Sequence, residues 1–260
     1  MMDNTRMYES EFALDCMFDI QPTNNRLNIK INKKYIVLST PRSGSTLLCS
    51  ALHNSKLAGV PFEYFHYSLL DKIGNPEKSL RNLYLYFHNL QYRRTSHNGV
   101  FGIKLHFLQY DRLFGNDSHG FDFLLKFDKF ILTYRRDKIL QAISSILAIE
   151  NNVWSRNTES ANGIVGRDFT SADITAISNY IKDMETQEQA WRNICHQQGI
   201  QPLEVAYEDL EADHSTEFDR ICNYLDIANL TSDMLIPITV KTTNTALTFK
   251  MKQLYIDSIQ

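Results

Sequence analysis

The sequence predicts an α/β fold in which helices flank both faces of a mostly parallel central sheet. Two observations predict it. Short runs rich in β-branched and aromatic residues alternate along the chain with longer segments whose apolar residues recur at helical spacing. No internal repeat, low-complexity run or Gly/Ser linker divides the 260 residues, which suffice for one large core. We therefore expect a single domain over 35–260, with 1–34 as an appendage packed on it.

The first predicted unit is a strand, a loop and a helix. The run 35–40 is short, apolar and bounded by Lys34 and Pro41, which is typical of a buried parallel strand that enters a loop. The helix that follows covers about 45–54, because its leucines and alanine recur on one face.

The rest of the chain continues the same alternation. A polar C-terminal region completes it and holds Lys241, Thr242 and Lys250. A long helix that ends at about 194 begins at a plausible cap, Ser171 or Asp173, and is expected to span the domain. The predicted elements are a helix over about 77–94, strands over 100–107 and 129–134, a helix after Arg136, a long helix to about 194, a strand over 203–207 and a helix near 214–225.

Composition excludes several classes of protein. The formal charge of −3 gives no global attraction for nucleic acid, and we expect no nucleic-acid partner. No apolar run approaches the length of a membrane-spanning helix, and the N-terminus lacks the apolar stretch of a secretory signal, so we expect a cytoplasmic protein with no transmembrane segment. The cysteines are scattered, which argues against a zinc site or a disulfide framework: Cys16, Cys49, Cys195 and Cys222.

The loop after the first strand has the composition of an anion-binding site. It reads Pro41-Arg42-Ser43-Gly44-Ser45-Thr46, and it stands where the free N–H groups and positive end of a helix point to a common place. Glycine allows close approach of the backbone, the hydroxyls can donate, and the arginine adds a fixed charge. The loop is not a Walker A motif, because it lacks that motif's first glycine and its lysine. An ordinary turn with a well-capped helix remains the alternative.

A second basic segment lies at the end of the strand 129–134. Arg135 and Arg136 follow this strand directly, at the edge where doubly wound sheets bind ligands. Ser144 comes eight positions after Arg136, about two helical turns on. The arginine pair and the serine could hold a second phosphate. The alternative is a solvated basic pair and an ordinary helical serine.

Over residues 35–210 the chain resembles the sulfotransferases that use 3′-phosphoadenosine 5′-phosphosulfate (PAPS) as donor. The phosphate loop, the arginine with a serine eight residues later, and the segments Lys104-Leu105-His106 and Tyr207-Glu208-Asp209-Leu210 carry this resemblance. Within that superfamily it is similar to the bacterial trehalose 2-sulfotransferase family. That family's Arg-Ser-Gly-Ser-Thr-Leu-Leu and Gly-x-Pro-x-Glu-aromatic-Phe patterns match 42–48 and 59–65, and Trp154 and Ala190-Trp191-Arg192 continue the likeness.

The resemblance implies a P-loop-like sulfotransferase fold, PAPS as co-substrate and no metal. Arg42, Ser43, Gly44, Ser45 and Thr46 would hold the 5′-phosphosulfate, and Arg42 would also steady the charge on the leaving group. Arg136 and Ser144 would hold the 3′-phosphate, and Tyr207 would touch the adenine. The Arg-Lys-Gly segment that grips the 3′-phosphate in other members is missing, and Lys241 is its candidate substitute.

The resemblance also supplies two candidates for the base that takes the acceptor's proton. The trehalose family pattern assigns this role to Glu63. In cytosolic sulfotransferases of small alcohols the matching histidine is the base and the lysine contacts the leaving group, which would be His106 and Lys104 here. These two residues share one face of a strand.

The implied acceptor is a carbohydrate or glycolipid, and a homodimer is possible by the same resemblance. Val60 replaces the glutamate of the trehalose pattern, so trehalose itself is not implied. Two other functions remain as alternatives: a magnesium-dependent nucleotide kinase with a degenerate phosphate loop, and a non-catalytic nucleotide-binding protein.

Overall fold

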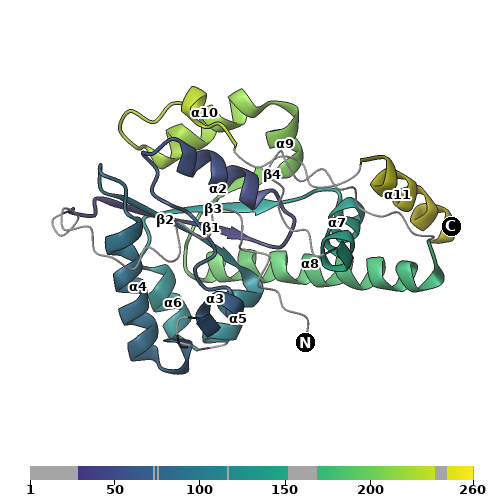
Figure 1. Cartoon of the computed structure of the whole chain (residues 1–260), viewed down its shortest axis with the longest axis horizontal. Helices are drawn as coiled ribbons and strands as arrows, with labels where there is room; N and C mark the ends of the chain where they lie inside the picture. Colours follow the sequence, from purple (N-terminus) through teal and green to yellow (C-terminus); the bar gives the residue numbers. More distant parts are fainter. Residues whose placement is uncertain are drawn as a thin grey trace.

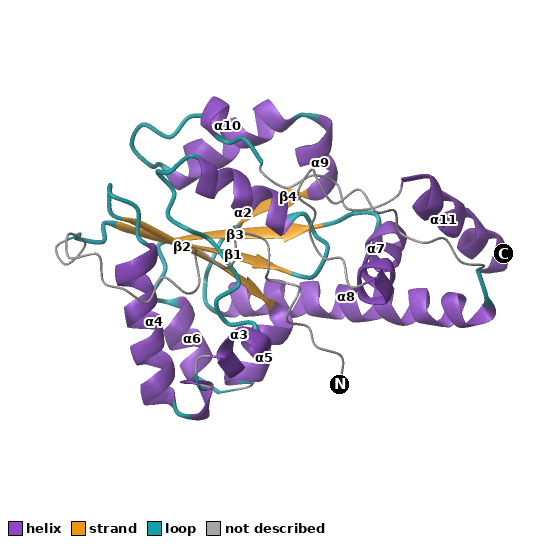
Figure 2. Ribbon diagram, in the orientation of Figure 1, coloured by secondary structure: helices purple, strands orange, loops and turns teal. Residues whose placement is uncertain are grey.

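The fold is built on one parallel sheet. The computed structural model describes residues 29–72, 74, 76–115, 117–151, 169–237 and 245–259. Within these residues the strands lie in the order β2-β1-β3-β4, and every pairing is parallel. Helices cover both faces of the sheet (Figures 1 and 2), so the predicted α/β fold is confirmed. The strands are β1 (Lys33–Ser39), β2 (Val100–His106), β3 (Lys129–Tyr134) and β4 (Leu203–Ala206).

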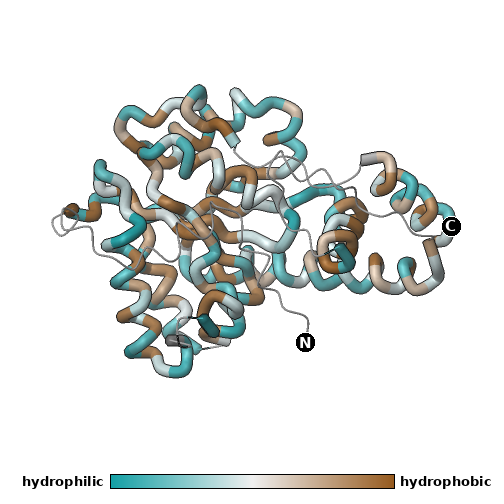
Figure 3. The backbone as a smooth tube through the Cα atoms, viewed as in Figure 1, coloured by the Kyte–Doolittle hydropathy of each residue, from teal (hydrophilic) through white to brown (hydrophobic). Residues whose placement is uncertain are grey.

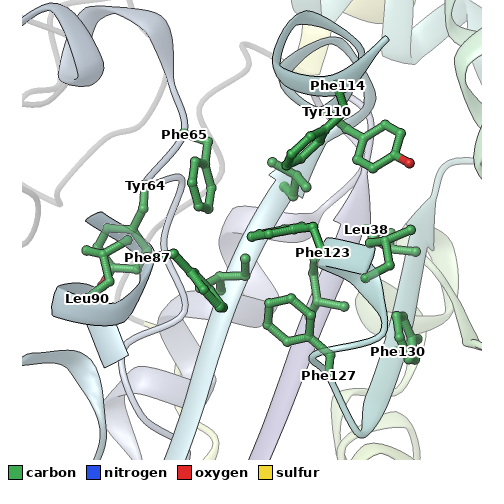
Figure 4. Close-up of a cluster of buried hydrophobic side chains, with 14 of the residues drawn as sticks. Leu38, Tyr64, Phe65, Phe87, Leu90, Tyr110, Phe114, Phe123, Phe127 and Phe130 are labelled. Carbon is green, nitrogen blue, oxygen red and sulfur yellow. The ribbon is translucent and has the colours of Figure 1, made fainter. Parts of the chain in front are cut away.

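Alternate side chains of β1 enter two different cores. Ile36 and Leu38 join an aromatic-rich cluster on one face, whereas Tyr35 and Val37 join a second cluster on the other. Figure 4 shows the first cluster, in which rings from helices and loops pack edge to face around Phe123. The most hydrophobic stretches of the chain meet at the strands in the centre of the molecule (Figure 3). A buried strand with both faces covered explains the unbroken apolar run of the sequence.

Three groups of helices surround the sheet. The first face carries α3 (Tyr67–Lys72), α4 (Leu80–Arg94), α5 (Phe107–Phe114) and α6 (His119–Leu124), with the short 3₁₀ helix η2 (Pro76–Lys78) before α4. The second face carries α2 (Ser45–Asn54), α9 (Tyr207–Ala212) and α10 (His214–Leu225), and η3 (Ser232–Met234) follows α10. The third group extends beyond the strand ends and consists of α7 (Lys138–Asn151), α8 (Ser171–Gln197) and α11 (Thr245–Ile259).

The long helix α8 spans the domain, as predicted. Its Ile177 packs in the third group, and its Trp191 and Cys195 pack in the first core. The predicted cap was wrong by one position: Thr170 is the N-cap, and the Asp173 carboxylate accepts hydrogen bonds from the Thr170 backbone N–H and hydroxyl at 2.7 and 2.9 Å. This is a form of the capping box.

The C-terminal region is not a polar tail throughout. Residues 245–259 form α11, which buries Met251 and Tyr255 against α7 and α8. The sequence pattern missed this helix because its apolar residues are spread around it: Phe249 and Ile259 are exposed, whereas Met251 and Tyr255 are buried. The helices α3, α5, α6 and α9 were also missed, since six to eight residues are too few to establish a helical period.

Parallel strands bring the candidate site residues to one edge. The loop 40–44 leaves β1, His106 ends β2, Arg135 follows β3 and Tyr207 follows β4, all at the carboxyl ends of the strands. This is the edge at which open α/β sheets bind their ligands. Most of the appendage 1–34, as well as Trp154 and Lys241, lies outside the described residues.

Candidate active site

The loop after β1 requires glycine at position 44. Gly44 has φ of +87°, and a Cβ atom there would lie 2.8 Å from Cδ2 of Tyr207. Arg42 also adopts a left-handed conformation, with φ of 61°. The Ser43 hydroxyl is buried, donates to the Thr40 carbonyl at 2.8 Å and lies 3.0 Å from the Thr133 hydroxyl. Ser43 therefore anchors the loop to β3 through its side chain.

The first turn of α2 has the properties of an anion-binding site. The helix begins at Ser45 directly after Gly44, no side chain caps it, and its first turn holds no acidic residue. The positive end of the helix is therefore not neutralised by an acid of its own first turn. Ser45 is buried, whereas Thr46 is exposed and accepts a hydrogen bond from the Lys104 ammonium at 2.9 Å.

Lys104 and His106 converge on the carboxylate of Glu63, which confirms that they share a face of β2. Oε1 of Glu63 lies 2.5 Å from Nζ of Lys104 and 3.2 Å from Nε2 of His106. Oε2 accepts a hydrogen bond from the Gln109 amide at 3.0 Å. The other ring nitrogen of His106 lies 2.8 Å from the Ser39 hydroxyl. The two candidate bases and Lys104 thus form one buried network, which reaches the first turn of α2 through Thr46.

This network keeps Glu63 ionised. Burial raises the pKa of Glu63, but the charges of His106 and Lys104 lower it by more, and the result is well below the ordinary value. His66, on the same turn, has its pKa lowered to about 4, chiefly by burial, and is neutral at pH 7. The site therefore holds a fixed carboxylate beside a buried ammonium.

The two residues that the resemblance assigns to the 3′-phosphate, Ser144 and Arg136, contact different side chains. Nε of Arg42 donates to the Ser144 hydroxyl at 2.8 Å. Arg136 instead makes two hydrogen bonds to the Asp209 carboxylate, at 2.6 and 2.5 Å. Ser144 thus lies beside the phosphate loop, and Arg136 lies beside α9.

Tyr207 stands between the loop and the strand end. Its ring is in contact with Gly44, and the Arg135 guanidinium lies over the ring at 4.6 Å from its centroid. The next residue, Glu208, accepts hydrogen bonds from the backbone N–H groups of Arg136 and Asp137 at 3.0 and 3.1 Å. A carboxylate therefore already occupies the start of α7.

Sequence reasoning missed Gln109 at this edge and gave Arg135 and Asp209 no separate roles. Gln109 stands three positions after His106, and its Oε1 accepts the His106 backbone N–H at 3.1 Å. This reciprocal spacing is a capping-box signal, which a histidine at the N-cap conceals. Arg135 and Asp209 were in view, but the sequence cannot tell which of two neighbouring side chains points inward.

Two further features concern the residues that the structure describes. None of their His, Cys, Asp and Glu side chains gather in groups of three or more that could hold a metal ion. None of the helices they form is both long enough and apolar enough to cross a membrane.

A parallel sheet whose carboxyl edge gathers cations and the open start of a helix is the arrangement of α/β proteins that bind phosphorylated ligands. More specifically, the chain belongs to the Stf0 sulphotransferase family, whose model matches residues 34–246. The resemblance found in the sequence is thereby confirmed.

The chain is also similar to several individual proteins. The chain is 26% identical over 211 residues to a trehalose 2-sulfotransferase of Mycobacterium tuberculosis, covering 67% of this chain and 77% of that protein. It is 25% identical over 208 residues to a trehalose 2-sulfotransferase of Mycolicibacterium smegmatis, covering 66% and 76%. Among solved structures, it is similar to the sulfotransferase domain of the Synechococcus PCC 7002 olefin synthase (TM-score 0.41, 15% identity, 88% and 96% covered). It is also similar to the sulfotransferase domain from the curacin biosynthetic pathway (TM-score 0.44, 14% identity, 88% and 98% covered).

Proposed function

We propose that the protein transfers the sulfuryl group of PAPS to a hydroxyl of a carbohydrate or glycolipid. Membership of a sulfotransferase family and the names of the mycobacterial relatives support the reaction and the class of acceptor. The observation that carries the proposal is the network that joins Glu63, through Lys104, to Thr46 at the start of α2. A proton acceptor and an anion-binding loop are thus within two hydrogen bonds of each other.

The residues present fit the donor. The start of α2, Thr46 and the Lys104 ammonium suit a 5′-phosphosulfate, because all three favour negative charge on the bridging and leaving oxygens. Arg42 adds a fixed charge to this phosphosulfate site, and its hydrogen bond to Ser144 connects the loop to a residue proposed for the 3′-phosphate. Tyr207 beside Gly44 offers a ring on which an adenine can pack.

In the proposed reaction the acceptor oxygen attacks sulfur while the bond from sulfur to the 5′-phosphate oxygen breaks. The acceptor's proton passes to the enzyme's base, and 3′-phosphoadenosine 5′-phosphate (PAP) leaves. Positioning and stabilisation of charge do most of the work in such transfers. The base must only accept a proton that the reaction makes acidic, so a carboxylate of low pKa is sufficient.

Between the two candidate bases, the hydrogen bonds favour Glu63. Both ring nitrogens of His106 are engaged, one by Ser39 and one by Glu63. A carboxylate oxygen accepts two hydrogen bonds, and Oε1 of Glu63 has two, from Lys104 and His106. Oε2 has one, from Gln109, and therefore keeps one acceptor position for the substrate hydroxyl. In this proposal His106 and Lys104 orient Glu63 and hold its charge.

Calorimetry of the full chain with PAP tests the donor. We expect binding that does not change when magnesium is removed and that weakens strongly for AMP, which lacks the 3′-phosphate. Preference for ATP with magnesium would favour the kinase alternative. Nucleotide binding without product after incubation with PAPS and a panel of sugars and glycolipids, trehalose included, would favour a non-catalytic role.

A further inference from the structure

Consecutive backbone carbonyls at the start of the phosphate loop are held by side chains. The Ser39 carbonyl accepts the indole N–H of Trp191 at 3.0 Å, and the Thr40 carbonyl accepts the Ser43 hydroxyl at 2.8 Å. An anion site built from backbone N–H groups needs such bonds, because a carbonyl oxygen that faced the anion would repel it. The carbonyl of the next residue, Pro41, is therefore a further point at which the loop has to be held.

Gln141 of α7 holds this carbonyl. Its side chain is fully buried, and its amide nitrogen donates to the Pro41 carbonyl at 2.8 Å and to the Thr40 hydroxyl at 3.0 Å. Chemistry fixes the orientation of the amide. The Lys138 ammonium can only donate and lies 3.4 Å from Oε1, whereas the Pro41 carbonyl can only accept and lies at the nitrogen. One buried amide therefore holds two consecutive residues of the loop.

The Pro41 carbonyl matters because it belongs to the peptide group that sets the conformation of Arg42. Arg42 has a φ of 61°, in the left-handed region that is unfavourable for a residue with a side chain. A peptide group rotates as a unit, so a flip of this one would change φ of Arg42 by about 180° and reverse the Pro41 carbonyl. The flip would thus release Arg42 from its unfavourable conformation. The hydrogen bond from Gln141 opposes it.

We propose that Gln141 is a positioning residue for the sulfuryl donor, which keeps the Pro41–Arg42 peptide group in its anion-binding orientation before the donor arrives. The inference rests on the proposed function and deepens it, because it names a residue that sets donor affinity without touching the donor. A loop that must first reorganise uses part of the binding free energy to do so. Once the donor is bound, the loop has the same conformation with or without this hydrogen bond, so the transfer step itself should not change.

The test is Gln141→Met, which keeps the volume of the side chain and removes the donor to Pro41. Calorimetry on the full chain should show that the dissociation constants of PAP and AMP both rise by about 3- to 10-fold, the equivalent of one hydrogen bond. The two should rise together, because the loop holds the 5′ end that both nucleotides share. With an acceptor found in the panel of sugars and glycolipids, KM for PAPS should rise by the same factor. At saturating PAPS, kcat should stay within about twofold of wild type.

Two further variants isolate the bond to the carbonyl. Thr40→Val removes the hydroxyl that Gln141 also contacts but leaves the Pro41 carbonyl held, so PAP affinity should stay within about twofold. Gln187→Met makes the same chemical change at a buried glutamine of α8, whose amide donates to Asp183 at 2.7 Å, and should leave PAP affinity unchanged. Thermal unfolding of each variant confirms folding. Gln141→Asn, whose amide is one methylene further from the loop, carries the test if Gln141→Met does not fold.

The outcomes separate the inference from the proposed function. Wild-type affinity for PAP in Gln141→Met would overturn the inference and leave the proposed function intact. Weakening of PAP with AMP unchanged would also overturn it, since Gln141 would then act at the 3′-phosphate and not through the loop. A fall in kcat with unchanged affinity would do the same, because it would place Gln141 in the transfer step. Failure of the wild-type protein to bind PAP would overturn both.

Discussion

In two glutamate–lysine pairs of this protein, the pKa of the glutamate is shifted in opposite directions. Glu63 pairs with Lys104 at the loop end of the sheet, and Glu188 of α8 pairs with Lys138 of α7. The pKa of Glu63 lies well below its ordinary value, because the charges of His106 and Lys104 outweigh burial. The pKa of Glu188 is raised, because burial outweighs the hydrogen bond from Lys138.

The side-chain donors around each carboxylate explain the difference. Glu63 receives hydrogen bonds or ion pairs from three side chains, those of Lys104, His106 and Gln109. Glu188 receives one side-chain hydrogen bond, from Lys138, which also donates to the Arg135 carbonyl. The backbone N–H of Arg135 and the charge of Arg192 also favour its ionised form, but burial outweighs them. A buried carboxylate remains ionised only where enough donors replace water. The comparison therefore supports the proposed role of Glu63 as a base, whereas Glu188 links α8 to α7.

The largest expected effect is on turnover. Glu63→Gln should lower kcat by about 10²- to 10⁴-fold, since it removes the proposed base without changing its shape. PAP affinity should stay within about threefold, because the donor-binding groups remain. Glu188→Gln is the matched control, and its turnover should stay close to that of wild type. Steady-state rates with a saturating acceptor measure both.

A Glu63→Gln variant with wild-type turnover would contradict the proposal that Glu63, unlike Glu188, acts in catalysis. The base would then be His106 or no side chain at all. Loss of turnover in His106→Asn, with Glu63→Gln unaffected, would distinguish these two cases.

The next largest effect is on stability. Lys104→Met should lower the free energy of unfolding by about 3–5 kcal/mol, because it leaves a buried, ionised carboxylate without its closest cation. Lys138→Met should cost less, since Glu188 already has a raised pKa and can take up a proton. Urea titration at neutral pH measures both. The double variant Glu63→Gln/Lys104→Met should recover part of the loss, and no recovery would mean that Lys104 stabilises the fold by packing alone.

Strand geometry made the relative position of two residues of this site predictable. Lys104 and His106 stand two residues apart on a strand, so the sequence alone places them on one face, and both contact Glu63. Glu63 itself was found only by resemblance, because it stands in a loop whose path no periodicity describes. Gln109 escaped because the helix that begins after His106 has only eight residues.

The residues after β3 show a second limit of prediction from the sequence. Arg135 and Arg136 are chemically identical neighbours, and the partner of Arg136 is Asp209, more than seventy residues away along the chain. Long-range pairing of this kind depends on the tertiary fold. The same holds for α11, whose few buried residues, such as Met251, gain their importance only from the helices they meet.

The pH dependence of stability should have opposite signs for the two glutamates. The stability contributed by Glu63 is present above its unfolded pKa and is lost as the pH falls through its lower folded pKa. The contribution of Glu188 is present below its unfolded pKa and is lost as the pH rises through its higher folded pKa. Unfolding free energies measured from about pH 3 to 7 check this. Wild type should lose its advantage over Glu63→Gln on acidification. Relative to Glu188→Gln, whose amide resembles the protonated glutamate, wild type should lose stability as the pH rises. Slopes of equal sign would contradict the comparison.

The smallest effect concerns a single donor to Glu63. Gln109→Met keeps the volume of the side chain but removes the hydrogen bond to Oε2, so the pKa of Glu63 should rise and the acid limb of the profile of kcat/KM against pH should move to higher pH. At neutral pH turnover should fall by less than about tenfold, because Lys104 and His106 still hold the other oxygen. Gln187→Met, a buried glutamine of α8 that donates to Asp183, is the control and should leave the profile in place. A lower rate with an unmoved acid limb would show that Gln109 only supports the packing of α5. A shift of the acid limb to higher pH would show that each hydrogen-bond donor lowers the pKa of Glu63. That would explain why the pKa of Glu63, with three side-chain donors, lies below its ordinary value while the pKa of Glu188 lies above it.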